Sequence, residues 1–180
     1  SRLQHIQVGD TVLVGRKASG TLLTQNLTPG RHLYLLSTGT GLAPFMSVIR
    51  DPDVYELFDK IVLVHGCRQV NELAYEHLIT HELPRNEWFG EQVRAKLLYY
   101  PTVTREAFRH QGRIPTLLET GRLPHDLCLP PLSTSDDRFM MCGSPEMLRD
   151  TRDLLDKLGL REGNMSQPGQ YVIERAFVDK

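Results

Sequence analysis

Features that mark several protein classes are missing from this 180-residue sequence. Its 21 Lys and Arg residues are balanced by 22 Asp and Glu residues, so it lacks the basic excess of nucleic-acid-binding domains. No apolar run approaches the roughly 20 residues that a membrane-spanning helix needs. The three cysteines are too few and too widely spaced for a disulfide framework, and no Cys/His spacing indicates a metal site. We therefore expect a cytoplasmic globular protein that neither binds nucleic acid nor spans a membrane.

Two phosphate-binding fingerprints are also absent, although a related pattern is present. Neither GxxxxGK[ST] nor GxGxxG occurs in the sequence. Residues 33–46, LYLLSTGTGLAPFM, instead join an apolar run to a helix-compatible segment through the glycine-rich turn STGTG at 37–41. A strand, a glycine-rich turn and a helix start together present backbone N–H groups to a phosphate. We expect this turn to contact a phosphate-containing ligand.

From residue 32 onwards, strand-like apolar runs alternate with helix-like segments. We expect strands at 33–36, 61–64, 95–100, 138–142 and 171–174, and helices at 42–50, 72–81, 113–119 and 146–158. This alternation predicts an α/β fold with a doubly wound, five-stranded parallel sheet.

Residues 1–31 differ from the rest because they are rich in turns, with one strand-like run at 11–15. A hairpin of this size is marginally stable by itself. Two interpretations fit the residues: the segment is the C-terminal remnant of a β domain, or it is a hairpin that packs on the domain formed by residues 32–180.

Ligands of doubly wound sheets bind beyond the carboxyl ends of the strands, so the residues that follow each strand are candidates for a site. Arg68, Arg105 and Arg113 lie in such positions. Guanidinium groups form paired hydrogen bonds with a dianionic phosphate. After the second strand no carboxylate appears before Glu72, which favours a nucleotide with a 2′-phosphate over one with a free 2′-hydroxyl. Each arginine alone could be an ordinary surface residue, but the three together favour a phosphate site.

The ends of the last two strands also hold candidate residues. Gly143 permits a close approach of the backbone to a ring or a phosphate. Cys142 either lines a ligand pocket or is a small core side chain. Glu174 ends the last strand on the ligand side, and the tail after it is apolar almost to its end. We expect this tail to dock either in the core or against a cofactor.

Six motifs, in order and in register over residues 33–180, resemble those of bacterial ferredoxin/flavodoxin–NADP reductases of the plant-type ferredoxin–NADP reductase superfamily. They are STGTGLAPF, VHGCR, TREAF, GRIP, MCGSPEML and VIERAFV. The N-terminal SRLQHIQVGDTVLV resembles the end of that family's antiparallel FAD-binding β-barrel. The resemblance implies that residues 1–31 are the last strands of the barrel and that residues 32–180 are the NADP-binding domain. The family's first flavin motif lies upstream of these residues, so we expect an incomplete FAD site and an inactive fragment.

The resemblance also implies a role for each candidate residue. Cys142 and Glu174 would stand beside the hydride-transfer site as catalytic residues. FAD would contact Ser1, beside its pyrophosphate, and the tail residues Ala176 and Phe177; Ala176 replaces the terminal tyrosine of plant enzymes. The remaining cofactor-binding residues would be Thr38, Gly39, Thr40, Gly41, Arg68, Arg105, Arg113, Gly143 and Ser144.

The activity implied by the resemblance is FAD-mediated hydride and electron transfer between NADP(H) and a one-electron carrier protein, namely ferredoxin, flavodoxin or both. The protein would be a monomeric, cytoplasmic, bacterial oxidoreductase. Two alternatives stay open. One is an NADPH-dependent flavin reductase that serves another acceptor, and the other is an isolated NADP-binding module without catalysis.

Overall fold

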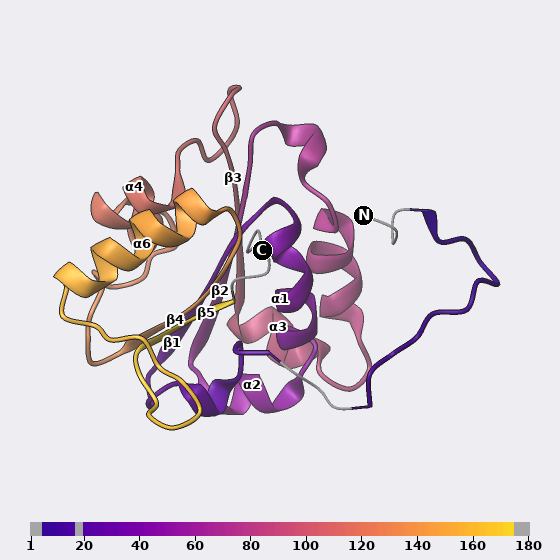
Figure 1. Ribbon diagram of the computed structural model, residues 1–180. Coiled ribbons are helices and arrows are strands. Elements are labelled where there is room, and N and C mark those ends of the chain that lie inside the picture. The colour runs from indigo at the N-terminus through magenta and orange to yellow at the C-terminus, as the bar shows by residue number, and fades with distance from the viewer. Residues whose placement is uncertain (1–4, 17–19, 175–180) are drawn as a thin grey trace.

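Five apolar runs of the sequence form one all-parallel sheet in the computed structural model, which describes residues 5–16 and 20–174. The strand order is β3-β2-β1-β4-β5 (Figure 1). The strands are β1 (His32–Thr38), β2 (Lys60–Cys67), β3 (Leu97–Val103), β4 (Asp137–Cys142) and β5 (Tyr171–Glu174). The chain leaves β1 in one direction towards β2 and β3, and later returns to the other side of β1 with β4 and β5. The predicted doubly wound, five-stranded parallel sheet is therefore confirmed, with its switch point between β1 and β4.

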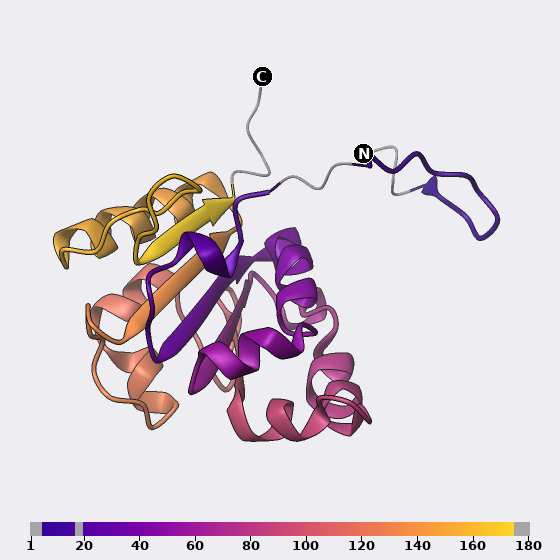
Figure 2. The ribbon, with the colours of Figure 1, turned by 90° about the horizontal axis from the view of Figure 1, so that it is seen from below.

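Helices cover both faces of this sheet (Figures 1 and 2). One face carries α1 (Leu42–Val48), α2 (Pro52–Leu57) and α3 (Gly90–Lys96), and the other carries α4 (Ile114–Glu119), α5 (Arg122–Asp126) and α6 (Pro145–Lys157). Along β1, Leu33 and Leu35 pack under the first group, whereas Tyr34 and Leu36 pack under the second. Both faces of the strand are thus buried, which explains why its sequence is continuously apolar rather than alternating. None of the helices in the described part of the chain is long and apolar enough to cross a membrane.

The structure corrects several expected boundaries. The helix expected at 72–81 is replaced by a 3₁₀ turn (Val70–Glu72) and a π-helical turn (Leu78–Glu82), because Tyr75 between them has a positive φ of 63°. Strand β3 continues through Pro101 to Val103. Proline is tolerated there because β3 is an edge strand.

The helices α2, α3 and α5 were not expected from the sequence. Asp51 and Pro52 start α2. Asp51 Oδ1 accepts a hydrogen bond from the Asp53 backbone N–H at 3.0 Å, and Pro52 occupies the first helical turn, where its missing N–H costs nothing.

The segment before β1 has two parts. Residues 5–16 are all exposed and form no strand, so the strand expected at 11–15 is absent from the described chain. Figure 2 shows this part extending away from the sheet. The part from residue 20 packs on the domain: it contains a 3₁₀ turn (Thr24–Asn26), and Leu27 forms a parallel bridge with Gly169. The assignment of residues 1–31 to a β-barrel stays a prediction.

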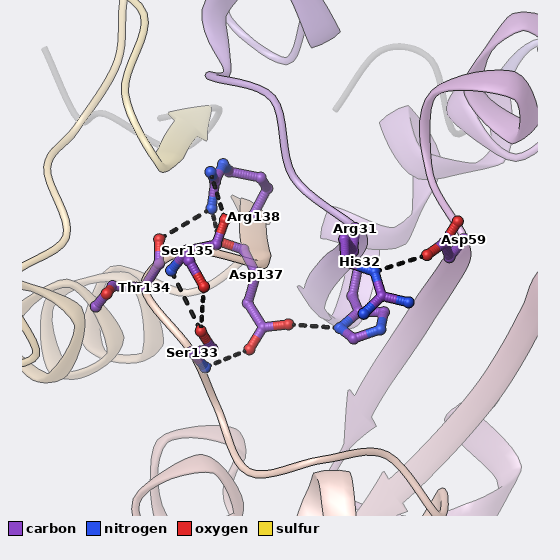
Figure 3. A network of polar contacts seen from close by, with 8 residues as sticks. All are labelled: Arg31, His32, Asp59, Ser133, Thr134, Ser135, Asp137 and Arg138. Carbon is purple, nitrogen blue, oxygen red and sulfur yellow. Dashed lines mark hydrogen bonds and ion pairs between the residues drawn. The ribbon is translucent and has the colours of Figure 1, made fainter.

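A buried polar cluster connects the amino ends of β1 and β4 (Figure 3). It lies at the end of the sheet opposite the carboxyl ends of the strands. His32 Nδ1 lies 2.8 Å from Asp137 Oδ1, and both side chains are less than a tenth exposed. The other carboxylate oxygen of Asp137 accepts a hydrogen bond from the Ser133 backbone N–H at 2.7 Å. Arg138 donates to the carbonyl oxygens of Thr28, at 2.9 Å, and Ser135, at 3.0 Å. Burial lowers the pKa of its guanidinium group, and the charges of Asp137 and Asp136 oppose that shift.

We predict that Asp137→Ala lowers the free energy of unfolding by about 3 kcal/mol, because it leaves buried donors without a partner. The matched control is Asp59→Ala, which removes the partner of Arg31 in an ion pair whose side chains are more than half exposed. That variant should lose less than about 1 kcal/mol. Urea denaturation measures both losses. Equal losses in the two variants would contradict the structural role of the buried cluster.

Candidate functional site

A cavity of about 850 Å³ opens at the carboxyl edge of the sheet, where the topology places ligands. Its walls come from the turn after β1, the end of β2, the loop that follows β2, and the starts of α4 and α6. We call it the edge cavity. Among the predicted site residues it is lined by Thr38, Gly39, Thr40, Arg68, Arg113 and Ser144.

The glycine-rich turn at 37–41 passes over the end of β4 in direct backbone contact. A Cβ atom on Gly41 would lie 2.1 Å from the Cys142 carbonyl oxygen, and one on Gly143 would lie 2.2 Å from Thr38 Oγ1. The Ser144 backbone N–H donates to that same Thr38 hydroxyl at 2.8 Å. Glycine is therefore required at 41 and 143, since no other residue allows the two segments to approach this closely.

Gly39 has a different role in the same turn. It adopts a positive φ of 54°, and no atom lies within 4 Å of its Cβ position. Its exposed backbone borders the edge cavity together with that of Thr40. The turn thus presents an unobstructed stretch of main chain to a ligand.

Two of the three predicted phosphate-binding arginines line the edge cavity. Arg68 lines it directly after β2. Arg105 does not line the cavity, but its backbone N–H donates to the Arg68 carbonyl oxygen at 2.9 Å. Arg113 lines the cavity directly before α4, and its Nη2 lies 2.9 Å from Glu146 Oε1 and 3.2 Å from Asp150 Oδ2 on α6. The structure therefore brings the backbones of Arg68 and Arg105 together, whereas Arg113 pairs with α6.

Glu72 stabilises the loop that carries Arg68. Its Oε2 accepts hydrogen bonds from the backbone N–H groups of Arg68, at 2.8 Å, and Gln69, at 3.2 Å. These bonds, and then the charges of Arg68 and Arg105, lower the pKa of Glu72. In the sequence, Glu72 served only to show that no carboxylate follows the second strand directly. The Q-x-x-E spacing from Gln69 to Glu72 is the signal that could have identified this capping box.

Sequence reasoning also assigned no role to the polar pair His65 and Cys67, which line the edge cavity at the end of β2. His65 is 1% exposed. Its Nδ1 lies 3.1 Å from Tyr99 Oη, and its Nε2 lies 3.3 Å from Cys67 Sγ. Burial lowers the pKa of His65 to about 4, against an opposing effect of Glu76. Burial, and then the charge of Glu72, raise the pKa of Cys67 to about 11. Both groups are thus neutral at pH 7.

The two predicted catalytic residues are neighbours across β4 and β5. Cys142 and Glu174 occupy paired positions in the sheet, and Cys142 is 1% exposed. Burial, and then the Glu174 carboxylate, raise the pKa of the Cys142 thiol. Neither residue lines the edge cavity, although the Cys142 carbonyl touches the glycine-rich turn that does. Ser1, Ala176 and Phe177 lie outside the described residues.

Comparison with known proteins identifies the family. The model of the oxidoreductase NAD-binding domain matches residues 35–153. The chain is 59% identical, over 181 residues, to the ferredoxin–NADP reductase of Azotobacter vinelandii, with 100% of this chain and 70% of that protein covered. The chain belongs to the ferredoxin–NADP reductase family. These proteins are FAD-dependent NADP oxidoreductases.

Two further relatives of this family agree. The flavodoxin/ferredoxin–NADP reductase of Rhodobacter capsulatus is 46% identical over 99% of this chain and 66% of its own length. A crystal structure of a ferredoxin NADP⁺ reductase from Neisseria gonorrhoeae, with bound FAD and NADP, is similar with a TM-score of 0.84 at 31% identity. The similarity covers 97% of this chain and 68% of that one. The resemblance seen in the sequence is confirmed, whereas the roles of individual residues and the division at residue 31 stay predictions.

We predict that Gly41→Ala lowers the free energy of unfolding by about 3 kcal/mol, because its methyl group would overlap backbone atoms of β4. The same change should weaken NADP⁺ binding, since it displaces the turn. Gly121→Ala is the matched control, because Gly121 has a positive φ of 69° but open space at its Cβ position. That variant should lose about 1 kcal/mol and keep its NADP⁺ affinity. Urea denaturation and titration calorimetry measure the two effects, and unchanged stability and affinity in Gly41→Ala would contradict the contact.

We predict that His65 makes stability depend on pH between about 6.5 and about 4. Its pKa in the folded protein is below the ordinary value of 6.5, so the unfolded chain binds the proton first as the pH falls. The stability that neutral His65 contributes is complete above pH 6.5 and is lost as the pH falls towards 4. Urea titrations at pH 7 and at pH 5 measure the free energy of unfolding. The decrease in this free energy from pH 7 to pH 5 should be about 1–2 kcal/mol smaller in His65→Asn than in the wild type.

The control for this effect is His125→Asn, because the His125 side chain is 87% exposed. It should lose as much stability as the wild type between the two pH values. If His65→Asn also behaves like the wild type, the burial of a neutral imidazole at the cavity is not what sets this dependence.

Proposed function

We propose that this chain supplies the NADP-binding part of a ferredoxin–NADP reductase, with residues 32–180 as the NADP-binding domain. The observation that carries the proposal is the placement of the glycine-rich turn, Arg68 and Arg113 around one cavity in a chain of this family. The names of the relatives support NADP and ferredoxin as the two substrates, and the Rhodobacter capsulatus relative supports flavodoxin as an alternative carrier.

The edge cavity fits a dinucleotide in size and chemistry. Its volume of about 850 Å³ lies within the range of pockets that bind drug-sized ligands and cofactors. The open backbone at Gly39 suits a pyrophosphate, because no atom lies within 4 Å of its Cβ position. Arg68, which lines the same cavity, suits the 2′-phosphate of the adenosine end.

Binding and orientation are the tasks that fall to the chain itself. When bound, NADP(H) and FAD supply the hydride and single-electron chemistry. We assign the glycine-rich turn to the pyrophosphate, and Arg68 with Arg105 to the 2′-phosphate. Contacts remote from the reacting carbon help to hold the reacting end in place. Cys142 presents a neutral thiol, because burial raises its pKa, and Glu174 Oε2 is an atom that can hold a proton.

The electron acceptor, the oligomeric state and the location also belong to this proposal. We propose that ferredoxin or flavodoxin exchanges electrons with a monomeric, cytoplasmic enzyme. The three unpaired cysteines, Cys67, Cys128 and Cys142, are compatible with a reducing compartment. A panel of ferredoxin, flavodoxin, a cytochrome and ferricyanide, each assayed with NADPH, distinguishes this enzyme from a flavin reductase with another acceptor. Absence of NADPH oxidation with every acceptor would favour a non-catalytic binding module.

We predict that Arg105→Ala raises the KM for NADPH about 10- to 100-fold, the cost of one charged hydrogen bond, and changes the KM for NADH less than about 2-fold. The assay is ferricyanide reduction by the full-length, FAD-loaded enzyme. Arg152→Ala is the matched control, because Arg152 lies in the middle of α6, where it pairs with Asp153, rather than in a loop after a strand at the carboxyl edge of the sheet. It should leave both values unchanged. Equal losses of Arg105→Ala with both nucleotides would refute the assignment of Arg105 to the 2′-phosphate.

A further inference from the structure

A threonine from the segment before β1 contacts the predicted catalytic carboxylate at the end of β5. Glu174 Oε2 accepts a hydrogen bond from the Thr21 backbone N–H at 2.8 Å and another from Thr21 Oγ1 at 2.7 Å. The Thr21 hydroxyl also lies 2.7 Å from the Ile173 carbonyl oxygen. These three contacts join positions more than 150 residues apart in the sequence, with a separation of 153 for the bonds to Glu174.

Thr21 is itself held by a buried side chain. Asn26 Nδ2 donates to the Thr21 carbonyl oxygen at 2.9 Å, and Asn26 is 2% exposed. The backbone carbonyl oxygen of Asn26 in turn accepts a hydrogen bond from the backbone N–H of Gly169, at 3.0 Å. Gly169 lies just before β5. The position of the Thr21 hydroxyl is therefore determined by the same part of the domain that carries Glu174.

The Thr21 hydroxyl has one proton and two acceptors at the same distance. When Glu174 is ionised, the proton points to Glu174 Oε2, which then accepts from both the hydroxyl and the backbone N–H of Thr21. When Oε2 carries a proton, that O–H donates to Thr21 Oγ1, and the threonine proton turns to the Ile173 carbonyl. Rotation of the Thr21 O–H bond therefore completes the hydrogen bonds of Glu174 in both of its protonation states, since a hydroxyl can donate and accept at once.

We propose that Thr21 is a positioning residue for Glu174, whose hydroxyl proton rotates between Glu174 Oε2 and the Ile173 carbonyl so that the carboxyl group gains or loses a proton without moving. The proton exchanged at Oε2 comes from, or returns to, solvent water. This proposal rests on the proposed function, because Glu174 is assigned to the reaction there, and it adds the residue that holds that carboxylate.

The titratable group that faces Glu174 from the neighbouring strand is Cys142 on β4. Its raised thiol pKa keeps it uncharged, so it does not add a second negative charge beside the carboxylate. From the segment before β1 the facing group is Thr21, whose hydroxyl does not titrate in this pH range. Of these two groups in the described part of the chain, the Thr21 hydroxyl is the one whose hydrogen bonds change with the charge of Glu174.

The test is a pH titration of the Glu174 carboxyl carbon by nuclear magnetic resonance in the full-length, FAD-loaded enzyme. The protein carries ¹³C-labelled glutamate, and the Glu174→Gln variant assigns the signal. Thr21→Val keeps the shape of the side chain and the backbone N–H but removes the hydroxyl, and Thr21→Ser keeps the hydroxyl. The ionised carboxylate loses a charge-assisted bond and the protonated form loses a weaker neutral one. The midpoint in Thr21→Val should therefore rise by about half a unit to one unit.

Thr21→Ser should titrate like the wild type, and Thr21→Ala should follow Thr21→Val. A wild-type midpoint in Thr21→Val, or an equal shift in Thr21→Ser, would overturn the proposal. In parallel, the pH profile of kcat for ferricyanide reduction should move in the same direction in Thr21→Val, with an unchanged KM for NADPH. If the wild-type enzyme does not oxidise NADPH, the proposed function fails, while the carboxyl titration still decides the role of Thr21.

Discussion

Backbone contact between the turn after β1 and the end of β4 is the constraint on which the ligand edge of this protein depends. The contact is possible because Gly41 and Gly143 carry no side chains, and the Thr38 hydroxyl bonds the two segments by accepting from the Ser144 backbone N–H. The central strand, the first helix and the start of α6 therefore meet at one place. A cavity forms beside that meeting point, at the switch point of the sheet.

Charge and burial divide the edge into two regions. On the side of β2, the loop that carries Arg68 is capped by Glu72 and accepts a hydrogen bond from the Arg105 backbone N–H, which follows β3. On the side of β4 and β5, Cys142 is buried and neutral, and Glu174 is held by Thr21. A nucleotide with a phosphate at one end and a reactive ring at the other suits this arrangement. The buried His32–Asp137 pair joins β1 and β4 at the other end of the sheet, away from the carboxyl ends of the strands.

The parts of the fold that depend on residues close together in the sequence could be predicted from it. The apolar run at 61–64 lies within β2, β5 spans 171–174 as expected, and Ser144 with Pro145 begins α6 as a cap followed by a proline. The positive φ of Tyr75, which interrupts the expected helix at 72–81, carries no local signal. Contacts between residues far apart in the sequence could not be predicted either. His65 meets Tyr99 on another strand, and Glu174 meets Thr21 from the segment before β1, so neither partner follows from spacing.

We propose that the edge cavity selects a nucleotide through its 2′-phosphate. Titration calorimetry of NADP⁺ and NAD⁺ against the full-length, FAD-loaded enzyme, under the same conditions, measures this selection directly. NADP⁺ should bind at least about tenfold more tightly, as expected for at least one charged hydrogen bond to the phosphate. Equal affinity for the two nucleotides would contradict it.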